Sequence, residues 1–410
     1  MTSPPPPARE RPAEPRLLEA MRDALAVAAT AGVPLGPNPR VGCVLLDAHG
    51  QVVAQGYHRG AGTPHAEVDA LAQAGGRARG GIAVVTLEPC NHTGRTGPCS
   101  AALIAAGVAR VVYAMDDPNP VASGGAARLA QAGIEVESGL LAEQAEQLNR
   151  AWLFALRRER PLVTWKFAAT LDGRSAAADG SSRWITSAVA RRDVHRLRAE
   201  ADVVLVGTGT ACIDDPRLSV RDARDRPLPD QPAVAVMGMR DLPPTLRLFE
   251  PEHPAQVLRL RTRDPGAALT ALFDAGRRHV FLEGGPTLAA AFLRAGMVDE
   301  IVAYLAPALL GAGRAAVPDL GITGIAEALR PTVTDITVLA MEPGVDEESG
   351  TGVESGSDEE SGTDVESESG VESGSDGGPG VQMEPGAGGV NPRDPADAQP
   401  NLRLTLSLSP

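Results

Sequence analysis

The chain has 410 residues, of which 43% are apolar, and its formal net charge is −14. This length allows two or three domains of ordinary size. No run of about 18 apolar residues occurs, which argues against a membrane-spanning helix. Residues 1–14 are rich in proline and charged residues and lack the apolar stretch of a signal peptide. A disordered leader and a cytoplasmic protein are therefore expected.

The net charge lies in one segment. Residues 343–400 contain 15 acidic residues and one basic residue, Arg393, so the rest of the chain is neutral. A neutral folded part argues against a nucleic-acid-binding surface, which needs many basic side chains. The four cysteines are too few for a disulfide framework in a chain of this length.

The first part of the chain alternates between helical and strand patterns. Strands are expected at 41–46, 52–56, 82–87, 111–114 and 134–137, and helices at 15–31, 65–74, 100–106, 125–132 and 142–158. Such alternation predicts an α/β domain over residues 15–150, with helices on the faces of a sheet.

A second α/β series begins at residue 160. Strands are expected at 162–168, 203–206, 233–237, 255–260, 280–282, 301–305 and 336–341, and helices at 188–200 and 288–295. Residues 343–400 show no apolar periodicity and contain a repeated motif similar to Val-Glu-Ser-Gly. This composition predicts disorder.

Strand character returns after the acidic segment. Leu402, Leu404, Leu406 and Leu408 alternate with other residues, as in a β-strand. We expect residues 401–408 to pair with 334–341, so that the acidic segment is a long loop. The second domain then comprises residues 160–342 and 401–410.

The first domain contains a set of zinc-binding residue types. His65-Ala66-Glu67 is followed by Pro89-Cys90 and by Cys99. One imidazole and two thiolates suit Zn²⁺, and three protein ligands leave a fourth position for water, whose pKa the metal lowers. Glu67 can then move a proton, as in the zinc deaminases. The pattern predicts a hydrolytic deaminase; the alternative is two buried cysteines and a satisfied histidine.

The spacing of the two cysteines departs from the common deaminase signature. Eight residues separate Cys90 from Cys99, whereas the signature has two. The insert, residues 91–98, is polar and rich in turn residues, which suits a polar or anionic substrate. The other cysteines and several histidines are interpreted as structural: Cys43, Cys212, His49, His253 and His279.

These residues resemble a known family. Segments 37–42, 56–58, 64–68, 86–92 and 117–120, together with the long cysteine spacing, are similar to the bifunctional deaminase/reductases of riboflavin biosynthesis. The resemblance covers residues 15–342 and 401–408. It implies a cytidine-deaminase-like three-layer α/β domain that deaminates a diaminopyrimidinone carrying a ribosylamino phosphate.

The resemblance also implies roles for individual residues of this domain. Zinc would be bound by His65, Cys90 and Cys99, with Glu67 as the proton shuttle. The substrate would be contacted by Asn38, His58, His92 and Arg95. A solvated loop charge is the alternative for Arg95.

The second domain has two glycine-rich turns. Residues 207–212 nearly match the dinucleotide fingerprint, but the third glycine is replaced by Cys212, and Pro216 would end the long helix that the fingerprint needs. Residues 283–287 follow a strand and precede a helix, whose first amides can bind a phosphate. A purely structural turn is the alternative in both cases.

Segments 166–173, 182–186 and 214–216, with Gly207, Thr210, Leu218 and Arg221, are similar to the reductase of the same family. That reductase has a dihydrofolate-reductase-like fold and reduces the ribosyl group to a ribityl chain with NADPH. By this resemblance, NADPH would be contacted by Ala168, Trp184, Thr210, Asp214, Gly284, Gly285 and Thr287. The substrate would be contacted by Lys166, Ser182, Arg198, Leu218, Arg221 and Glu283. Ile213 stands where the family usually has a small residue.

Lys166 is the only lysine of the chain. Because arginine cannot replace a titratable amine, a chemical role is favoured over chance survival. By the resemblance to the reductase, Lys166 and Glu283 are the candidates for polar or proton-transfer roles, since an opened ribose must exchange protons.

The expected partner is a small phosphorylated pyrimidine, not nucleic acid or a membrane, and the family suggests a homo-oligomer. Three alternatives remain at this stage. In the first, the second domain binds a nucleotide without catalysis. In the second, the chain is a nucleic-acid deaminase. In the third, the main function of the protein is binding to partners through the acidic segment.

Overall fold

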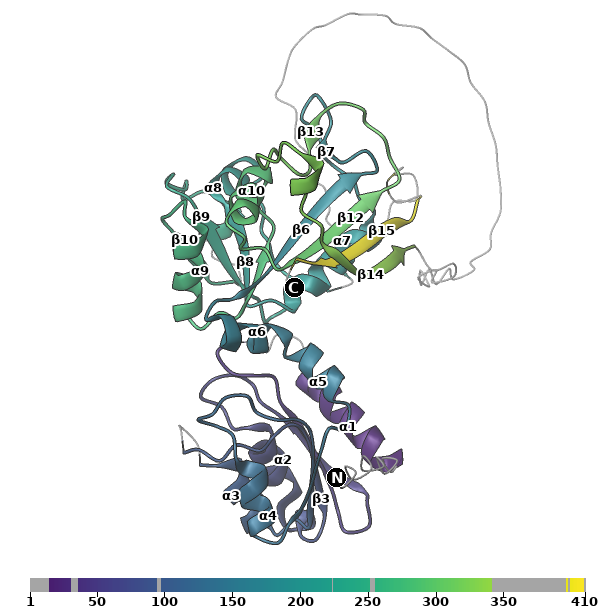
Figure 1. The fold of residues 1–410 in the computed structure, drawn as a ribbon, viewed down its shortest axis with the longest axis vertical. Coiled ribbons are helices and arrows are strands. Elements are labelled where there is room, and N and C mark those ends of the chain that lie inside the picture. The colour runs from purple at the N-terminus through teal and green to yellow at the C-terminus, as the bar shows by residue number, and fades with distance from the viewer. Residues whose placement is uncertain are drawn as a thin grey trace, which may run out of the picture.

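The computed structural model describes residues 15–30, 36–93, 97–222, 224–250, 255–340, 396 and 399–408. They form two α/β domains stacked along the long axis of the molecule and joined by α5 (Ala142–Leu148) and α6 (Arg150–Arg158) (Figure 1). Among these residues, no helix has the length and apolar character needed to cross a membrane. The predicted leader and most of the acidic segment lie outside the described residues.

The N-terminal domain is built on a five-stranded sheet with the order β2-β1-β3-β4-β5. Its strands are β1 (Gly42–Leu46), β2 (Val52–Tyr57), β3 (Ile82–Leu87), β4 (Arg110–Met115) and β5 (Glu135–Ser138). β1 is antiparallel to both of its neighbours, whereas β3, β4 and β5 are mutually parallel. The predicted strands are confirmed, with small differences in their bounds.

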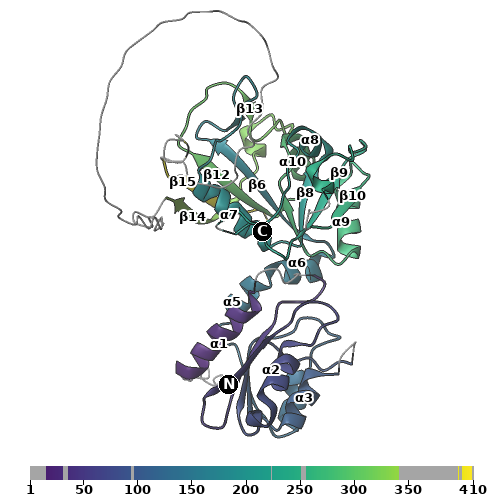
Figure 2. The ribbon, with the colours of Figure 1, turned by 180° about the vertical axis from the view of Figure 1, so that it is seen from behind.

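Helices cover both faces of this sheet, so β3 and β4 are almost entirely buried apolar runs. One face packs against α2 (Ala66–Ala74), α3 (Cys99–Ala106) and α4 (Gly125–Gln131), and the other packs against α1 (Pro15–Ala28), α5 and α6. Figure 2 shows α1 and α5 side by side. The expected three-layer domain is confirmed.

The segment expected as one helix over 142–158 is two helices that meet at Asn149. The Asn149 side chain is buried and binds the backbone of Arg40 in both directions. A side-chain amide engaged with a distant segment in this way is not visible in a local hydrophobic pattern.

The C-terminal domain has an eight-stranded sheet with the order β10-β9-β8-β11-β6-β12-β15-β14. The strands are β6 (Leu162–Thr170), β8 (Val203–Gly207), β9 (Ala233–Met237), β10 (Val257–Leu260), β11 (His279–Leu282), β12 (Glu300–Ala306), β14 (Thr332–Leu339) and β15 (Asn401–Ser407). The strands from β10 to β12 in this order are parallel. A short second sheet pairs β7 (Arg174–Ala176) with β13 (Arg314–Ala315).

Alternate side chains of the parallel strands enter two cores. One face packs against α9 (Pro265–Asp274) and α10 (Pro286–Arg294), and the other against α7 (Ala188–Ala199) and α8 (Thr208–Ile213). Single-turn 3₁₀ helices complete the description: η1 (Gly75–Ala78), η2 (Arg247–Phe249) and η3 (Ile325–Glu327). We did not expect α9, although Asp264 caps it and Pro265 is its first residue.

The last strand confirms the predicted pairing. β15 lies between β12 and β14 and is antiparallel to both, with Leu339 opposite Asn401. Two side chains of β15 fasten it to α7: Oδ1 of Asn401 accepts a hydrogen bond from the Ser187 N–H, and Arg403 pairs with Asp193 at 3.0 Å. The acidic segment thus connects two neighbouring antiparallel strands.

Deleting residues 344–399 and joining the strands by a short turn is expected to preserve the fold. Closing a shorter loop favours the folded state by about 2 kcal/mol. A second variant that lacks residues 401–410 is expected to lose the C-terminal domain, because β15 is an internal strand. Circular dichroism and thermal unfolding would test both; unfolding of the first variant, or a native-like second variant, would contradict this account.

Candidate active sites

Two helices of the N-terminal domain begin at the same place, beyond the carboxyl end of β3. His65 precedes α2, Cys99 is the first residue of α3, and Cys90 follows β3 closely. Nδ1 of His65 lies 3.2 Å from Sγ of Cys99 and 3.5 Å from Sγ of Cys90. All three donor atoms lie within 4.8 Å of one another. This cluster of one nitrogen and two sulfurs fits a zinc ion.

The surroundings of Cys90 favour its thiolate. A hydrogen bond from the Cys99 side chain lowers the pKa of Cys90, and hydrogen bonding from His65 acts in the same direction. The backbone N–H of Cys99, at the start of α3, also donates to Sγ of Cys90 at 3.4 Å. Since the thiolate is the form that binds metals, this sulfur is prepared for that role.

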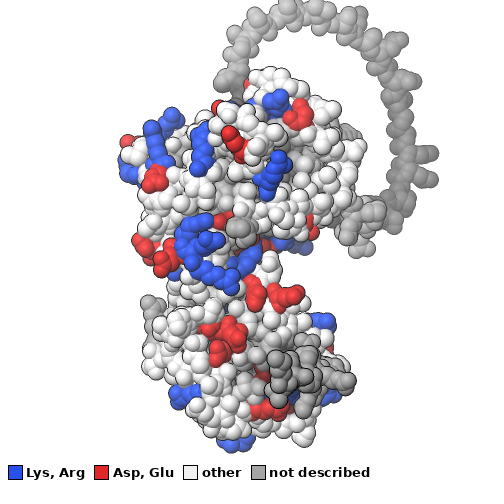
Figure 3. Space-filling view, in the orientation of Figure 1, with Lys and Arg blue, Asp and Glu red and all other residues white. Residues whose placement is uncertain are grey.

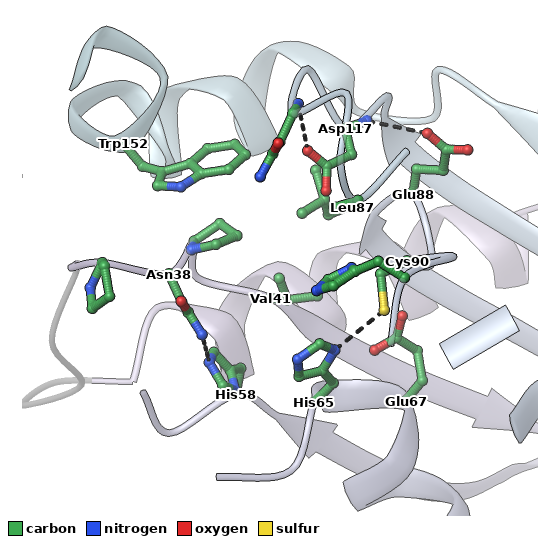
Figure 4. Close-up of a pocket in the computed structure, with 15 residues that line it drawn as sticks. Asn38, Val41, His58, His65, Glu67, Leu87, Glu88, Cys90, Asp117 and Trp152 are labelled. Atoms are coloured by element: carbon green, nitrogen blue, oxygen red, sulfur yellow. Dashed lines mark hydrogen bonds between the residues drawn. The ribbon is translucent and has the colours of Figure 1, made fainter. Parts of the chain in front are cut away.

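Glu67 lies in the first turn of α2 and points toward the sulfur of Cys90 (Figure 4). The residue is only 3% exposed. Burial raises the pKa of Glu67 to about 7. A carboxyl group that titrates near neutrality can both accept and release a proton.

These groups face a cavity of about 180 Å³. Figure 4 shows the Trp152 indole from α6 on the side of the cavity opposite His58 and His65. The residues that line the cavity are Pro37, Asn38, Pro39, Val41, His58, His65, Glu67, Leu87, Glu88, Cys90, His92, Asp117, Asn119, Ala122 and Trp152.

Asn38 and His58 form a defined pair in this cavity. Nδ1 of His58 lies 3.0 Å from the Pro64 carbonyl oxygen, which can only accept, so Nδ1 carries the proton. Nε2 of His58 then accepts from Nδ2 of Asn38 at 2.8 Å. Burial lowers the pKa of His58, which agrees with a neutral ring. This hydrogen bond uses Nδ2 of Asn38, so the carbonyl oxygen of the same amide can still accept a hydrogen bond from a ligand.

The structure brings together most of the residues predicted for the deaminase site. Asn38, His58, His65, Glu67, Cys90 and His92 line the cavity, and Cys99 adjoins it. Nδ1 of His92 is buried and has no hydrogen-bond partner within the described ranges, so it is available to a ligand. Arg95 lies outside the described residues.

A second polar group lies beside the carboxyl end of β11 in the C-terminal domain. Glu283 follows β11, and its carboxylate forms a two-point pair with the Arg198 guanidinium, with Nη2 and Oε2 2.9 Å apart. Nζ of Lys166, on β6, lies 3.9 Å from the same carboxylate. Because β11 and β6 are adjacent, this edge of the sheet brings Lys166 and Glu283 together.

Burial sets the proton affinities of this group. It lowers the pKa of Lys166, an effect that Glu283 opposes and Arg198 reinforces. The pKa of Glu283 is lowered: burial would raise it, but the charge and hydrogen bonds of Arg198 outweigh that effect. One carboxylate therefore neutralises two cations inside the domain.

Ser219 extends the group toward Arg221. Its carbonyl oxygen accepts from Nη1 of Arg198 at 3.2 Å, and Nδ1 of His195 lies 3.1 Å from the same oxygen. Its hydroxyl accepts from Nε of Arg221 at 3.2 Å. Four of the residues predicted for the reductase substrate are thus connected: Lys166, Arg198, Arg221 and Glu283.

The two glycine-rich turns of this domain lie side by side. They follow β8 and β11, which are neighbouring strands, and the Gly285 N–H donates to the Thr210 hydroxyl at 3.2 Å. Open space lies beside Gly209, where a Cβ would meet nothing within 4 Å. Turns at the carboxyl ends of parallel strands are the usual place for a nucleotide, so this edge fits NADPH. As expected, α8 is a single short helix that ends before Asp214.

The other residues predicted for this site are more scattered. Ser182, Asp214 and Thr287 are exposed, and the half-exposed indole of Trp184 packs against the Arg191 guanidinium at 4.5 Å. Ala168 lies on β6 two residues after Lys166 and borders the α7 core. The Leu218 side chain is buried in the apolar core beside β8. The roles given to these residues stay predictions.

Comparisons with known proteins agree with both sites. The model of the cytidine and deoxycytidylate deaminase zinc-binding region matches residues 15–115, and the model of the RibD C-terminal domain matches residues 161–345. The riboflavin biosynthesis protein RibD of Mycobacterium tuberculosis is 54% identical over 295 residues, which cover 72% of this chain and 86% of that protein.

The chain belongs to the RibD family. It is a bifunctional deaminase and reductase of riboflavin biosynthesis, with a zinc-binding deaminase domain and a reductase domain that uses NADPH. Acinetobacter baumannii RibD has a similar structure: its TM-score is 0.71 at 38% identity, over 79% of this chain and 96% of that one. A Thermotoga maritima diaminohydroxyphosphoribosylaminopyrimidine deaminase/5-amino-6-(5-phosphoribosylamino)uracil reductase has a TM-score of 0.69 at 29% identity, over 78% and 95% of the two chains.

Sequence reasoning missed several residues of the two sites. Glu88, Asp117, Asn119 and Trp152 line the deaminase cavity. The match of segment 117–120 to the family could have identified Asp117 and Asn119 as site residues. No sequence pattern indicated Trp152, which comes from a helix far along the chain. In the reductase group, Ser219 acts mainly through its backbone oxygen, which no side-chain pattern reveals.

Replacing Glu283 by glutamine is expected to lower the free energy of unfolding by about 3 kcal/mol at pH 7, because it leaves two buried cations without a counter-charge. The pKa of Glu283 is lower in the folded state than in the unfolded state, where it is about 4.3. The stabilisation that its carboxylate gives the folded state is therefore complete above the unfolded-state pKa and disappears as the pH falls through the folded-state pKa. The difference between wild type and Glu283→Gln should therefore shrink in acid.

Urea unfolding at several pH values would measure this difference. Glu250→Gln is the matched control, because Glu250 pairs with Arg217 at the surface, where an ion pair contributes less than about 1 kcal/mol. An equal effect of the two substitutions, or a difference that does not change with pH, would contradict the assignment.

Proposed function

We propose that the N-terminal domain deaminates a diaminopyrimidinone carrying a ribosylamino phosphate and that the C-terminal domain then reduces the ribosyl group to a ribityl chain. The observation that carries the proposal is the convergence of His65, Cys90 and Cys99 on a cavity that Glu67 also faces. The connected group of Lys166, Arg198 and Glu283 supports the second step.

In the deaminase domain, His65, Cys90 and Cys99 hold the zinc ion. When bound, zinc supplies the Lewis-acid chemistry that activates water in hydrolytic deamination. The Glu67 carboxyl takes a proton from the attacking water and passes it to the departing amine, which its pKa near neutrality permits.

Four further residues contact the substrate in this domain. His58 holds Asn38 by a hydrogen bond, so the Asn38 amide is oriented before the substrate arrives. His92 offers a buried ring nitrogen to the cavity. Arg95, in the insert between the two cysteines, binds the phosphate or the ring.

In the reductase domain, NADPH supplies the hydride when bound. Ala168, Trp184, Thr210, Asp214, Gly284, Gly285 and Thr287 hold NADPH, and Lys166, Ser182, Arg198, Leu218, Arg221 and Glu283 contact the substrate. Arg198 and Arg221 both contact Ser219, and each is also paired with a carboxylate, Glu283 or Asp225. The ammonium of Lys166 is the candidate proton donor, because its burial lowers its pKa.

The remaining proposals concern location and partners. We infer a cytoplasmic enzyme that acts without nucleic acid or membrane; the thiols of all four cysteines support this inference, since none forms a disulfide. Figure 3 shows both acidic and basic side chains on each domain, with a group of basic side chains at the junction.

A homo-oligomer is supported by the edge of the C-terminal sheet. β14 is an edge strand in the described sheet, and Val333, Ile336 and Val338 are 51%, 63% and 61% exposed. An apolar edge strand of this kind is suited to pairing with a second copy.

The proposed order of reactions is tested with the purified protein and the diaminopyrimidinone phosphate, with products identified by mass spectrometry. Deamination is expected without NADPH, and the ribityl product only when NADPH is added. Cys99→Ala should lose zinc, and its deaminase rate should fall at least about 1,000-fold, but it should still reduce the deaminated intermediate. Lys166→Met should keep zinc and the deaminase activity but lose the reduction.

A mixture of the two variants should carry out both reactions in order. Cys43→Ala is the control, because Cys43 is buried in the apolar core and is not one of the three residues of the metal cluster. Zinc retained by Cys99→Ala, or NADPH consumption retained by Lys166→Met, would refute the corresponding assignment.

The oligomer is tested by sedimentation. Ile336→Asp is expected to convert an oligomer into monomers, because it places a charge in the apolar edge. Val121→Asp, at another exposed apolar position in the N-terminal domain, should leave the oligomer intact. A monomeric wild-type protein would refute the proposal.

A further inference from the structure

One wall of the deaminase cavity is held by residues outside the deaminase domain. Pro37, Asn38 and Pro39 line the cavity. The Gly36 N–H, next to this segment, donates to Oδ1 of Asp202 at 3.1 Å. Asp202 belongs to the reductase domain, directly before β8, and is only 2% exposed.

The Asp202 carboxylate is fixed from the other side by the reductase sheet. Its Oδ2 accepts from the backbone N–H of Arg278 at 2.6 Å and of His279 at 3.0 Å. Its own backbone bonds with His279 and Ala233. A carboxylate with this many partners has little freedom, so it fixes the position of Gly36 relative to the reductase domain.

The contact at Gly36 is also close in space. A Cβ at this position would lie 1.8 Å from the carbonyl oxygen of Gly276, in the loop between α9 and β11. Only glycine allows the two backbones to approach this closely. The start of the cavity wall therefore lies directly against the reductase domain.

The other end of the wall is held by the linker between the domains. Asn149 accepts from the Arg40 N–H at 2.8 Å and donates to the Arg40 carbonyl oxygen at 3.0 Å. It stands where α5 meets α6, the helix that also brings Trp152 into the cavity. Burial lowers the pKa of Arg40, and the charge of Asp202 partly opposes this effect. Arg40 therefore lies in the electrostatic field of the Asp202 carboxylate.

We propose that Asp202 and Asn149 are positioning residues for deamination: by holding the two ends of residues 36–40, they make substrate binding in the deaminase cavity depend on the docked reductase domain. Asn38 lies midway between the two anchors. A displacement of the segment by about 1 Å would break the hydrogen bond between Asn38 and His58 and misplace the amide that faces the substrate. The proposal rests on the proposed contact between Asn38 and substrate.

The test disturbs the two ends of residues 36–40 in the full-length enzyme and changes no residue that lines the cavity. Gly36→Ala forces the segment away from Gly276, and Asn149→Asp removes the donor to Arg40 while keeping the side-chain shape. Both variants are expected to raise the KM for deamination about tenfold, the effect of losing one or two hydrogen bonds, with a smaller change in kcat.

Two readouts should not change in these variants: the zinc content and the reduction of supplied deaminated intermediate by NADPH. Gly76→Ala is the matched control, because a Cβ at Gly76 meets nothing within 4 Å and its backbone is ordinary.

Asn38→Ala separates this proposal from the proposed function. If Asn38→Ala leaves KM unchanged, the substrate contact itself is wrong. If Asn38→Ala raises KM while Gly36→Ala and Asn149→Asp behave as wild type, the positioning proposal is overturned. Equal losses of both activities together with lower stability would also overturn it, because the junction would then serve folding alone.

Discussion

The deaminase site depends on one constraint: α2 and α3 must begin at the same point, beyond the end of β3. Packing of α2 and α3 against the same face of the sheet satisfies this constraint, since small buried residues such as Ala66 and Ala70 let the helices lie close to the strands. His65, Glu67 and Cys99 are thereby placed by helix starts, and Cys90 by a strand end. The positive ends of the two helices favour the thiolate that a metal requires. Zinc chemistry here is a consequence of how the core is packed.

The reductase site follows a different rule. The carboxyl ends of β8 and β11 bring Gly207 and Glu283 together, and Lys166, in the middle of the longer β6, lies at the same level, although the three residues are far apart in the sequence. The charge arrangement is compact, because a single carboxylate serves both Arg198 and Lys166. β6 starts at the junction and runs away from the deaminase domain (Figure 1), which puts this edge on the far side of the domain. The residues that line the deaminase cavity run from Pro37 to Trp152, so among the described residues none of its lining comes from the reductase domain.

Much of this architecture could be predicted from the sequence, and the limits have a physical cause. The strands and the zinc cluster were predictable because apolar periodicity and the spacing of His65, Cys90 and Cys99 are local signals. The pairing of β15 was predictable because period-2 leucines after a non-periodic segment need a partner strand. Asn149 and Asp202 were not, since their hydrogen bonds join segments more than 100 residues apart. Trp152 was not either, because it reaches the cavity from the helix that leads out of the domain. Predictions for Leu218 came from resemblance alone, and its side chain lies in the core.

The position of β15 has a consequence for how the protein is made. β12 is synthesised before the acidic segment, and its neighbour in the sheet is synthesised after it. While the acidic segment emerges from the ribosome, the nascent C-terminal domain exposes an open sheet edge, which is the kind of surface that aggregates.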